Sequence, residues 1–496
     1  MKSIFVIVSY LLCCITMLAK DIVTTVTPDS VRVLRNPLNG WVMYVGRTWD
    51  ADFWDKYGYD DMPTSDGGTV KVSDYANTCY VRTSWSSLEP EEGKYAWNQA
   101  DSRLMRMLNS ARERQMKLAF RIVVDGRDQG QNTPLYVFEA GAQGFPDPNN
   151  PKVMCPYPDD SVFQVKYAKF LEAFAKEFND PDKVDFIDAY GLGKWGEAHA
   201  VRYANYNNKL TVFRWITSLY GRTFSRVPLV INYHRLVGDT LSWAAPSLDS
   251  EQLLQIAIDN GYSLRHDAFG MTGYYQEWEK SFASRWRFLR PIIMEGGWIT
   301  GAHHRYWIDL SGAYRENHSE DVRRGEYEAS AMAHVNMMDF RVNDETRSWF
   351  GKSFNLVRRF VSEGGYRLFP SKIVTPDRCR HDGTVCIRYE WNNMGWGYCP
   401  TNIPQWNQKY KVGIALVDGS GTPVKIWVDE QTDLSTWLKG KSSNYVVKLD
   451  ALPKGNYRWA VSLVDKTKGN TPGLQMAVAE DRMKNGWLIL NKVTIK

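Results

Sequence analysis

The chain has 496 residues, and its 61 lysines and arginines exceed its 56 aspartates and glutamates by five. This length predicts one large domain and a smaller one. The small net charge, with both signs well mixed, argues against nucleic acid or an acidic membrane surface as a partner. Tryptophan (20), tyrosine (27) and phenylalanine (20) are abundant. Such flat apolar side chains pack in cores, and in an exported protein they also stack on sugar rings.

The N-terminus has the features of a secretory signal. Lys2 precedes an apolar run over residues 4–18, and Ala19 precedes the polar chain. This pattern predicts cleavage near Ala19 and export to the periplasm, the cell surface or the medium. Modification of Cys13 or Cys14 as in a lipoprotein is disfavoured, because the usual small residues do not precede either cysteine. The run is too short to predict a transmembrane helix, and no later stretch is long and apolar enough to span a bilayer.

Five cysteines follow the signal, an odd number without a Cys-x-x-Cys pair, so no zinc site is predicted. The last three lie close together in the sequence, and one disulfide among them is a hypothesis that the spacing allows. The five are Cys79, Cys155, Cys379, Cys386 and Cys399.

Short apolar segments alternate with amphipathic ones from residue 36 to about residue 341. Strands are predicted at residues 41–45, 78–85, 117–123, 184–190, 229–233, 268–271, 291–294 and 333–338. Helices are predicted at residues 98–115, 162–178, 210–224, 251–260 and 278–288. This alternation predicts eight parallel βαβ units, which is an α/β fold of the (β/α)8 TIM-barrel type. The long aromatic loops 46–77, 124–160 and 296–319 would then border a cleft at the C-terminal face of the barrel.

The pattern changes after a helix predicted at residues 346–362. Short strands separated by Gly and Pro turns are predicted at residues 384–391, 410–417, 423–428, 444–449 and 457–464. They predict an all-β, Ig-like sandwich. The expected organisation is a signal peptide over residues 1–19, a barrel over residues 20–364 and a sandwich over residues 365–496. The sandwich either binds carbohydrate through Trp391, Trp396 and Trp406 or buttresses the barrel, and the alternation around Trp391, which is typical of core residues, favours the structural role.

The second predicted strand leads into a recognisable motif. Arg82 and Trp85 are followed by Glu-Pro-x-x-Gly-x-Tyr-x-Trp over residues 89–97. This segment resembles the second-strand region of clan A glycoside hydrolases, especially families 35 and 42. The resemblance implies that Arg82 and Trp85 face the substrate. A guanidinium at a strand end can hold a carboxylate ionised and oriented. The alternatives are a structural ion pair for Arg82 and a capped turn at Glu89.

The fourth predicted strand ends in a glycine-rich loop with the pattern Gly-x-Trp-Gly-Glu-x-His over residues 193–199. Glu197 is placed there as a general acid, and Trp195 beside it would raise the pKa of a carboxyl by desolvation. His199 is expected either to orient Glu197 or bind substrate, or to serve only the fold. Clan A enzymes usually have Asn before the acid, and this chain has Gly196. The pattern also resembles an uncharacterised barrel-plus-sandwich family, number 4832 in the unknown-function domain series.

The seventh predicted strand ends in Glu295, followed by Gly296, Gly297 and Trp298. The apolar strand would deliver Glu295 to the barrel mouth, and the glycines would let a sugar approach the backbone. This resembles the seventh-strand nucleophile of clan A enzymes. The resemblance implies a retaining reaction with Glu197 and Glu295 as catalytic residues and carboxyl groups roughly 5–5.5 Å apart.

Further side chains are expected near the cleft because they follow predicted strands. The predicted substrate-binding set is Arg82, Trp85, Arg121, Trp195, His199, Asn232, His234, Tyr274 and Trp298. The pair His303–His304 has no carboxylate or further histidine at ligand spacing, so neither a metal nor a cofactor is predicted. No phosphate-binding loop and no Gly-x-Ser-x-Gly elbow is present.

The sequence therefore predicts an exported glycoside hydrolase that cleaves a β-linked glycan, with carbohydrate as its partner. The alternative is a glycan-binding barrel that has lost the chemistry, which Gly196 favours. A barrel acting on another bond, such as an ester, ranks last because no nucleophilic Ser or Cys arrangement is recognisable.

Overall fold

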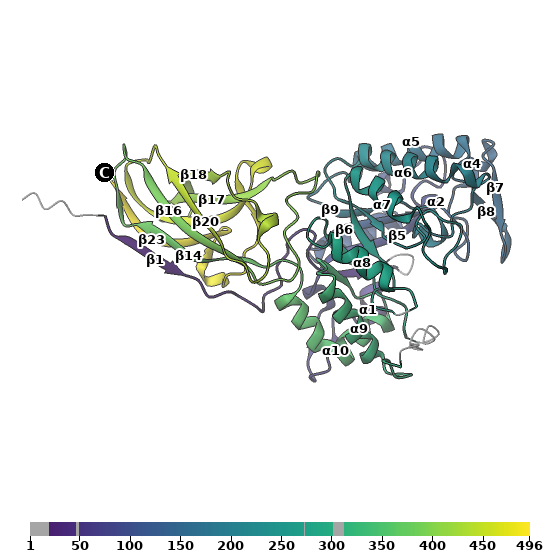
Figure 1. Cartoon of the computed structure of the whole chain (residues 1–496), viewed down its shortest axis with the longest axis horizontal. Coiled ribbons are helices and arrows are strands. Elements are labelled where there is room, and N and C mark those ends of the chain that lie inside the picture. Colours follow the sequence, from purple (N-terminus) through teal and green to yellow (C-terminus); the bar gives the residue numbers. More distant parts are fainter. Residues whose placement is uncertain (1–18, 46–48, 272, 301–311) are drawn as a thin grey trace, which may run out of the picture.

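The computed structural model describes residues 19–45, 49–271, 273–300 and 312–496. The predicted signal, apart from Ala19, and the pair His303–His304 lie outside these residues. The chain folds into a helix-covered barrel and an all-β part that lie side by side (Figure 1). Within the described ranges no helix has both the length and the apolar character needed to cross a bilayer.

Eight parallel strands close into a barrel, which confirms the predicted (β/α)8 fold. Nearly every residue of these strands is buried, as expected of a barrel filled by side chains and covered by helices. In chain order they are β2 (Gly40–Tyr44), β5 (Ala76–Ser84), β6 (Lys117–Val123), β9 (Val184–Asp188), β10 (Leu229–Asn232), β11 (Tyr262–His266), β12 (Ile292–Met294) and β13 (Met337–Asp339).

Amphipathic helices cover the barrel and bury one face each. Ser102 caps the first of them by accepting from the Met105 amide, and Asp160 caps the second by accepting from the Phe163 amide. The helices are α3 (Arg103–Glu113), α5 (Ser161–Phe178), α6 (Lys209–Thr223), α7 (Ser250–Asp259), α8 (Glu277–Trp286), α9 (Ser319–Met332) and α10 (Asp344–Glu363).

Two predicted strands are displaced. The sixth ends at His266 instead of spanning residues 268–271, because Ala268 has a φ of 47° and the chain turns there. The eighth begins at Met337 instead of residue 333, because His334, with a φ of 53°, lies in the turn after α9. Helix α9 was not predicted. It buries Arg323 and Glu326 on its inner face, so its apolar periodicity is hidden.

The loops at the C-terminal end of the barrel contain short elements of their own. They are α1 (Phe53–Tyr57) and the hairpin β3 (Met62–Pro63) and β4 (Thr69–Val70) after β2, α2 (Trp85–Leu88) after β5, and α4 (Leu135–Glu139) with the hairpin β7 (Gly144–Asp147) and β8 (Asn150–Pro156) after β6.

The all-β part consists of two sheets, as predicted for a sandwich. One has the order β1 (Asp21–Thr25), β14 (Leu368–Pro376), β16 (Val385–Asn393) and β19 (Ser443–Leu449). The other has the order β15 (Arg378–Cys379), β23 (Trp487–Ile495), β20 (Gly455–Asp465), β17 (Tyr410–Val417) and β18 (Pro423–Asp429), with β21 (Thr471–Leu474) and β22 (Met483–Lys484) attached. Trp391, Trp396 and Trp406 are all buried, so they serve the core.

Strand β1 belongs to the sandwich, although residues 20–364 were predicted to form the barrel. It pairs antiparallel with β14, so the chain begins in the sandwich before it enters the barrel. The indole of Trp396 donates to Val335 O and Asn336 donates to Tyr398 O, which ties the two parts together.

The five cysteines of the described chain are free, so the structure contradicts the hypothesis of a disulfide among Cys379, Cys386 and Cys399. Cys379 lies in one sheet, Cys386 is exposed on a strand of the other, and Cys399 is buried in the loop that follows.

Candidate active site

A cavity of about 230 Å³ opens at the C-terminal end of the barrel strands. Aromatic side chains form much of its wall: Trp195, Trp243, Tyr274 and Trp298. Its charged lining is Arg82, Glu197, Asp267 and Arg341. Aromatic faces and carboxyl groups thus meet where the active sites of this fold lie.

Glu197 lies in a loop after β9 whose backbone requires glycine. A Cβ at Gly191 would lie 2.3 Å from Ile122 O, and one at Gly193 would lie 2.3 Å from His199 O. Gly196 has a φ of 74°, in the left-handed region that favours glycine, and a Cβ there would lie only 3.3 Å from Val123 Cγ2, which gives a local reason for glycine at that position. The side-chain amide of Asn232 donates to Glu197 O (3.0 Å), so Asn232 fixes the backbone of the loop.

The Glu197 carboxylate is buried at the cavity floor. Arg121 Nη1 donates to Oε1 at 3.1 Å, and His199 Nε2 lies 3.4 Å from Oε2. Burial raises the pKa of Glu197, but the contact with His199 and the charges of Arg121 and Arg82 outweigh burial, so the pKa lies below its ordinary value. The desolvation that was predicted for Glu197 is present, but it does not determine the direction in which the pKa of Glu197 shifts.

Glu295 directly follows β12 and is completely buried beneath the cavity. Its Oε2 accepts from Arg121 Nη2 at 2.8 Å and lies 2.6 Å from Arg265 Nη2, while its Oε1 accepts from Arg341 Nη1 at 2.5 Å. Burial raises the pKa of Glu295, and the three guanidinium groups more than reverse that effect and hold the pKa well below its usual range.

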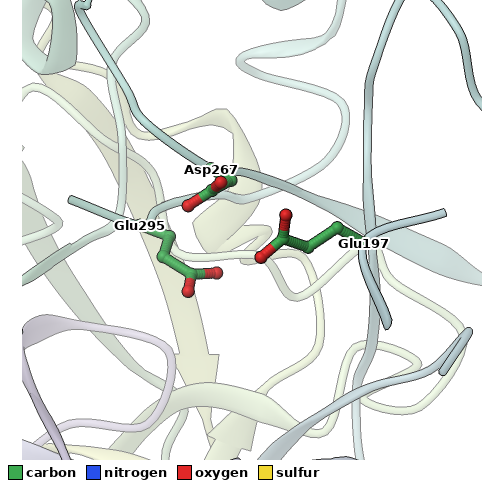
Figure 2. Close-up of side chains that lie close together, drawn as sticks. All are labelled: Glu197, Asp267 and Glu295. Carbon is green, nitrogen blue, oxygen red and sulfur yellow. The ribbon is translucent and has the colours of Figure 1, made fainter. Parts of the chain in front are cut away.

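Asp267, immediately after β11, is a third carboxyl group, which was not predicted from the sequence. One oxygen from each of Asp267, Glu197 and Glu295 lies within 4.8 Å of the others, and Figure 2 shows the three side chains pointing toward one another. Its Oδ1 accepts from Arg341 Nη2 at 2.8 Å. Burial, reinforced by the charges of Glu197 and Glu295, raises the pKa of Asp267 well above its ordinary value. Strand-end position would have signalled Asp267 had the sixth strand been placed correctly.

The predicted roles of two arginines change. Arg82 lines the cavity, but its hydrogen bonds go to Trp195 O (3.1 Å) and Tyr44 Oη (3.4 Å) and not to a carboxylate. Arg121, predicted to bind substrate, is fully buried and joins Glu197 and Glu295 from below.

The arginines that contact the three carboxyl groups argue against a metal ion at this site. The three carboxyl groups are close enough to share a cation. Arg121, Arg265 and Arg341 already contact them, however, so their negative charge is compensated by side chains of the chain itself. The donor set is therefore that of an arginine–carboxylate network and a poor fit to a divalent ion.

The predicted aromatic and histidine residues divide into two groups. Trp195, Tyr274 and Trp298 line the cavity, together with Trp243, which was not predicted because its loop has no strand-end signal. His199 and His234 are buried behind Trp243, with ring centroids 5.6 and 5.7 Å from it. Burial lowers the pKa of His234 well below its ordinary value.

Trp85 does not reach the cavity. It is fully buried between the barrel and α5, packed against Tyr167 and Phe170, and its indole donates to Glu89 Oε2 at 2.8 Å. The prediction that Trp85 binds substrate is therefore wrong, because the turn after β5 directs its ring into the core. Glu89 holds the turn, which is the structural alternative considered for it.

No protein-family model and no curated protein sequence matches the chain. Among solved structures it is similar to xylanase B from Clostridium stercorarium F9, with 14% identity over 61% of this chain and 86% of that one and a TM-score of 0.36. It is also similar to a GH30 endoxylanase from Clostridium papyrosolvens C71, with 10% identity over 86% and 97% and a TM-score of 0.36. A third is endo-glycoceramidase II from Rhodococcus sp. in a lactosyl-enzyme intermediate, with 14% identity over 86% and 100% and a TM-score of 0.37.

Proposed function

We propose that the protein is an exported glycoside hydrolase that cleaves a β-linked glycan. The observation that carries the proposal is the cavity itself, in which Trp195, Trp243 and Trp298 stand around a floor of carboxyl groups. Sugar rings stack on such aromatic faces, and paired carboxyl groups are the chemical requirement for breaking a glycosidic bond.

A retaining double displacement is the mechanism that this geometry favours. The nearest oxygens of Glu197 and Glu295 are within 4.8 Å, which suits direct attack by one carboxylate better than the wider gap that an inverting enzyme leaves for water. In this proposal Glu295, held ionised by Arg121, Arg265 and Arg341, attacks the anomeric carbon. Attack requires that Arg341 release Oε1, because Glu295 is covered in the free protein. Glu197, on the opposite side, is the first candidate for the proton donor.

A second candidate is a glycan-binding protein without hydrolytic chemistry. The complete burial of Glu295 and the engagement of both of its oxygens favour it. The cavity would then bind sugar through its aromatic wall, and the carboxylates would serve only to balance the arginines.

The test is a panel of β-linked oligosaccharides and aryl β-glycosides, with the configuration of the released sugar followed by NMR. The wild type is expected to release a β-configured product first, and Glu295→Gln is expected to lose turnover by about 1,000-fold or more while still binding the glycan in calorimetry. Glu480→Gln, an exposed site in the sandwich, is the matched control. Binding without turnover in the wild type would favour the second candidate.

A further inference from the structure

The three carboxyl groups of the site differ in how many basic side chains contact them. Glu295 contacts three, from Arg121, Arg265 and Arg341. Glu197 contacts Arg121 and His199. Asp267 contacts one, Arg341, which it shares with Glu295. A proton shared among close carboxyl groups resides on the least compensated one, which here is Asp267.

Access distinguishes the same residues. Asp267 and Glu197 line the cavity, and the Asp267 side chain is the most exposed of the three, at 20%. Glu197 is 4% and Glu295 0% exposed. Of the carboxyl groups that a substrate can touch, Asp267 is therefore both the more accessible and the one that fewer basic side chains contact.

We propose that Asp267 is a catalytic residue, the proton donor to the leaving-group oxygen, and that Glu197 remains ionised beside it. This inference rests on the proposed function. In the first step the Asp267 proton passes to the glycosidic oxygen, whose bond to the anomeric carbon breaks with its electron pair, and a Glu295 oxygen bonds to that carbon. In the second step water attacks the anomeric carbon, the ester bond to Glu295 breaks, and a proton of the water returns to Asp267.

Arg341 connects the proposed proton donor with the proposed nucleophile. Its Nη1 contacts Glu295 and its Nη2 contacts Asp267, at 2.5 and 2.8 Å. In the first step Glu295 loses its negative charge to the ester while Asp267 acquires one. Because one guanidinium bridges both groups, its positive charge stays paired throughout, and its shift toward Asp267 uncovers Glu295. Glu197 contacts Arg121 instead, so it lacks this connection.

The pH dependence follows from the groups that face Asp267. These are Glu197 from the loop after β9, Glu295 after β12, Arg341 after β13 and Arg121 on β6. The two glutamates raise the pKa of Asp267 and the two arginines lower it, while burial is the largest effect and raises it. The active form carries the proton and is lost as the pH rises through this pKa, so Asp267 sets the alkaline limb of kcat/KM.

The experiment compares Asp267→Asn, Glu197→Gln and the exposed control Asp382→Asn on phenyl and 2,4-dinitrophenyl β-glycosides of the sugar that the wild type accepts. The kcat/KM of Asp267→Asn is expected to fall about 100-fold or more on phenyl glycosides and less than about tenfold on dinitrophenyl glycosides, whose departure needs no acid, and its alkaline limb is expected to disappear. The kcat on dinitrophenyl glycosides is expected to fall as well, because Asp267 also accepts the proton of water in the second step. Azide is expected to rescue Asp267→Ala and give a β-glycosyl azide. If Glu197→Gln shows this pattern and Asp267→Asn does not, the inference is overturned.

A measurement without substrate separates this inference from the proposed function. The infrared band of a protonated carboxyl at pH 7 is expected to lose intensity in Asp267→Asn and to keep it in Glu197→Gln. A band that disappears only in Glu197→Gln contradicts the inference, whatever the turnover. If the wild type hydrolyses no glycoside while the Asp267 band is present, the proposed function fails and the location of the proton stands.

Discussion

Arg121 and Glu295 form an ion pair across the barrel. Nη2 of Arg121, on the third barrel strand, donates to Oε2 of Glu295, after the seventh, at 2.8 Å, and both side chains are completely buried. The same guanidinium also contacts Asp188 and Glu197. Arg121 therefore compensates three carboxylates at the centre of the barrel.

Replacing Arg121 tests this relationship. Arg121→Met is expected to lower the free energy of unfolding by about 3–5 kcal/mol, because it leaves buried carboxylates uncompensated. Denaturant unfolding measures the loss. Arg380→Met, which removes the exposed ion pair with Asp382, is the control and is expected to change stability by less than about 1 kcal/mol. Equal losses in the two variants would show that the network is not a stabilising one.

Trp243 and Trp85 are expected to respond in opposite ways to truncation. Trp243 lines the cavity and is 48% exposed, whereas Trp85 is fully buried. Trp243→Ala is expected to weaken glycan binding by about tenfold at nearly unchanged stability, a difference of 1.4 kcal/mol. Trp85→Ala is expected to cost about 3–5 kcal/mol of folding stability. Calorimetry measures glycan binding by both variants, and thermal unfolding measures their stability. A Trp85→Ala protein that is stable but deficient in binding would contradict the placement of Trp85.

The barrel was predictable because most of its strands are predominantly apolar and its helices carry one apolar face. The third strand, residues 117–123, matches β6 in both bounds. Prediction failed where charge is buried. Helix α9 hides its inner face because Arg323 and Glu326 occupy it, and β11 ends in Arg265 and His266, which give no apolar signal. Misplacing that strand removed Asp267 from the candidates.

The site was predictable where a carboxylate follows a strand, as Glu295 does. The charge compensation of Glu295 by three arginines could not be predicted from the sequence. Only the closed barrel brings together the strands and strand ends that carry Arg121, Arg265 and Arg341. For the same reason the sequence could not show that Arg121 and Arg82 lower the pKa of Glu197 against the effect of desolvation.

The loop that carries Trp298 depends on a buried glutamate of α10. Glu345 Oε1 accepts from the amides of Ile299 and Thr300, at 2.9 and 2.8 Å. Glu345→Ala is expected to speed hydrogen exchange at these two amides and to raise KM by about tenfold, equivalent to 1.4 kcal/mol, with a smaller change in kcat. Glu328→Ala, exposed on α9, is the control. Unchanged exchange at both amides would rule out this positioning role.

Asp339 provides a test of the buried electrostatics through pH. Burial raises its pKa to about 6, against the opposing charges of Arg341 and Arg265. A carboxyl whose pKa is raised by folding stabilises the native state at low pH, and this contribution is lost as the pH rises from the ordinary value of 3.8 through about 6. Asp339→Asn cannot ionise, so its melting temperature relative to the wild type is expected to increase between pH 4 and 7.

Asp321 is the matched control of opposite sign. Its hydrogen bonds with Arg315 lower its pKa, so its contribution is present above the ordinary pKa and is lost as the pH falls. Asp321→Asn is therefore expected to be least stable relative to the wild type near neutral pH and to approach it in acid. Thermal unfolding of both variants from pH 2 to 7 is expected to give difference curves of opposite slope, that of Asp321→Asn below about pH 4 and that of Asp339→Asn between about pH 4 and 6. A flat Asp339→Asn curve between about pH 4 and 6 would mean that burial does not control the protonation of Asp339, and that the arginines of the barrel mouth compensate it as fully as they compensate Glu295.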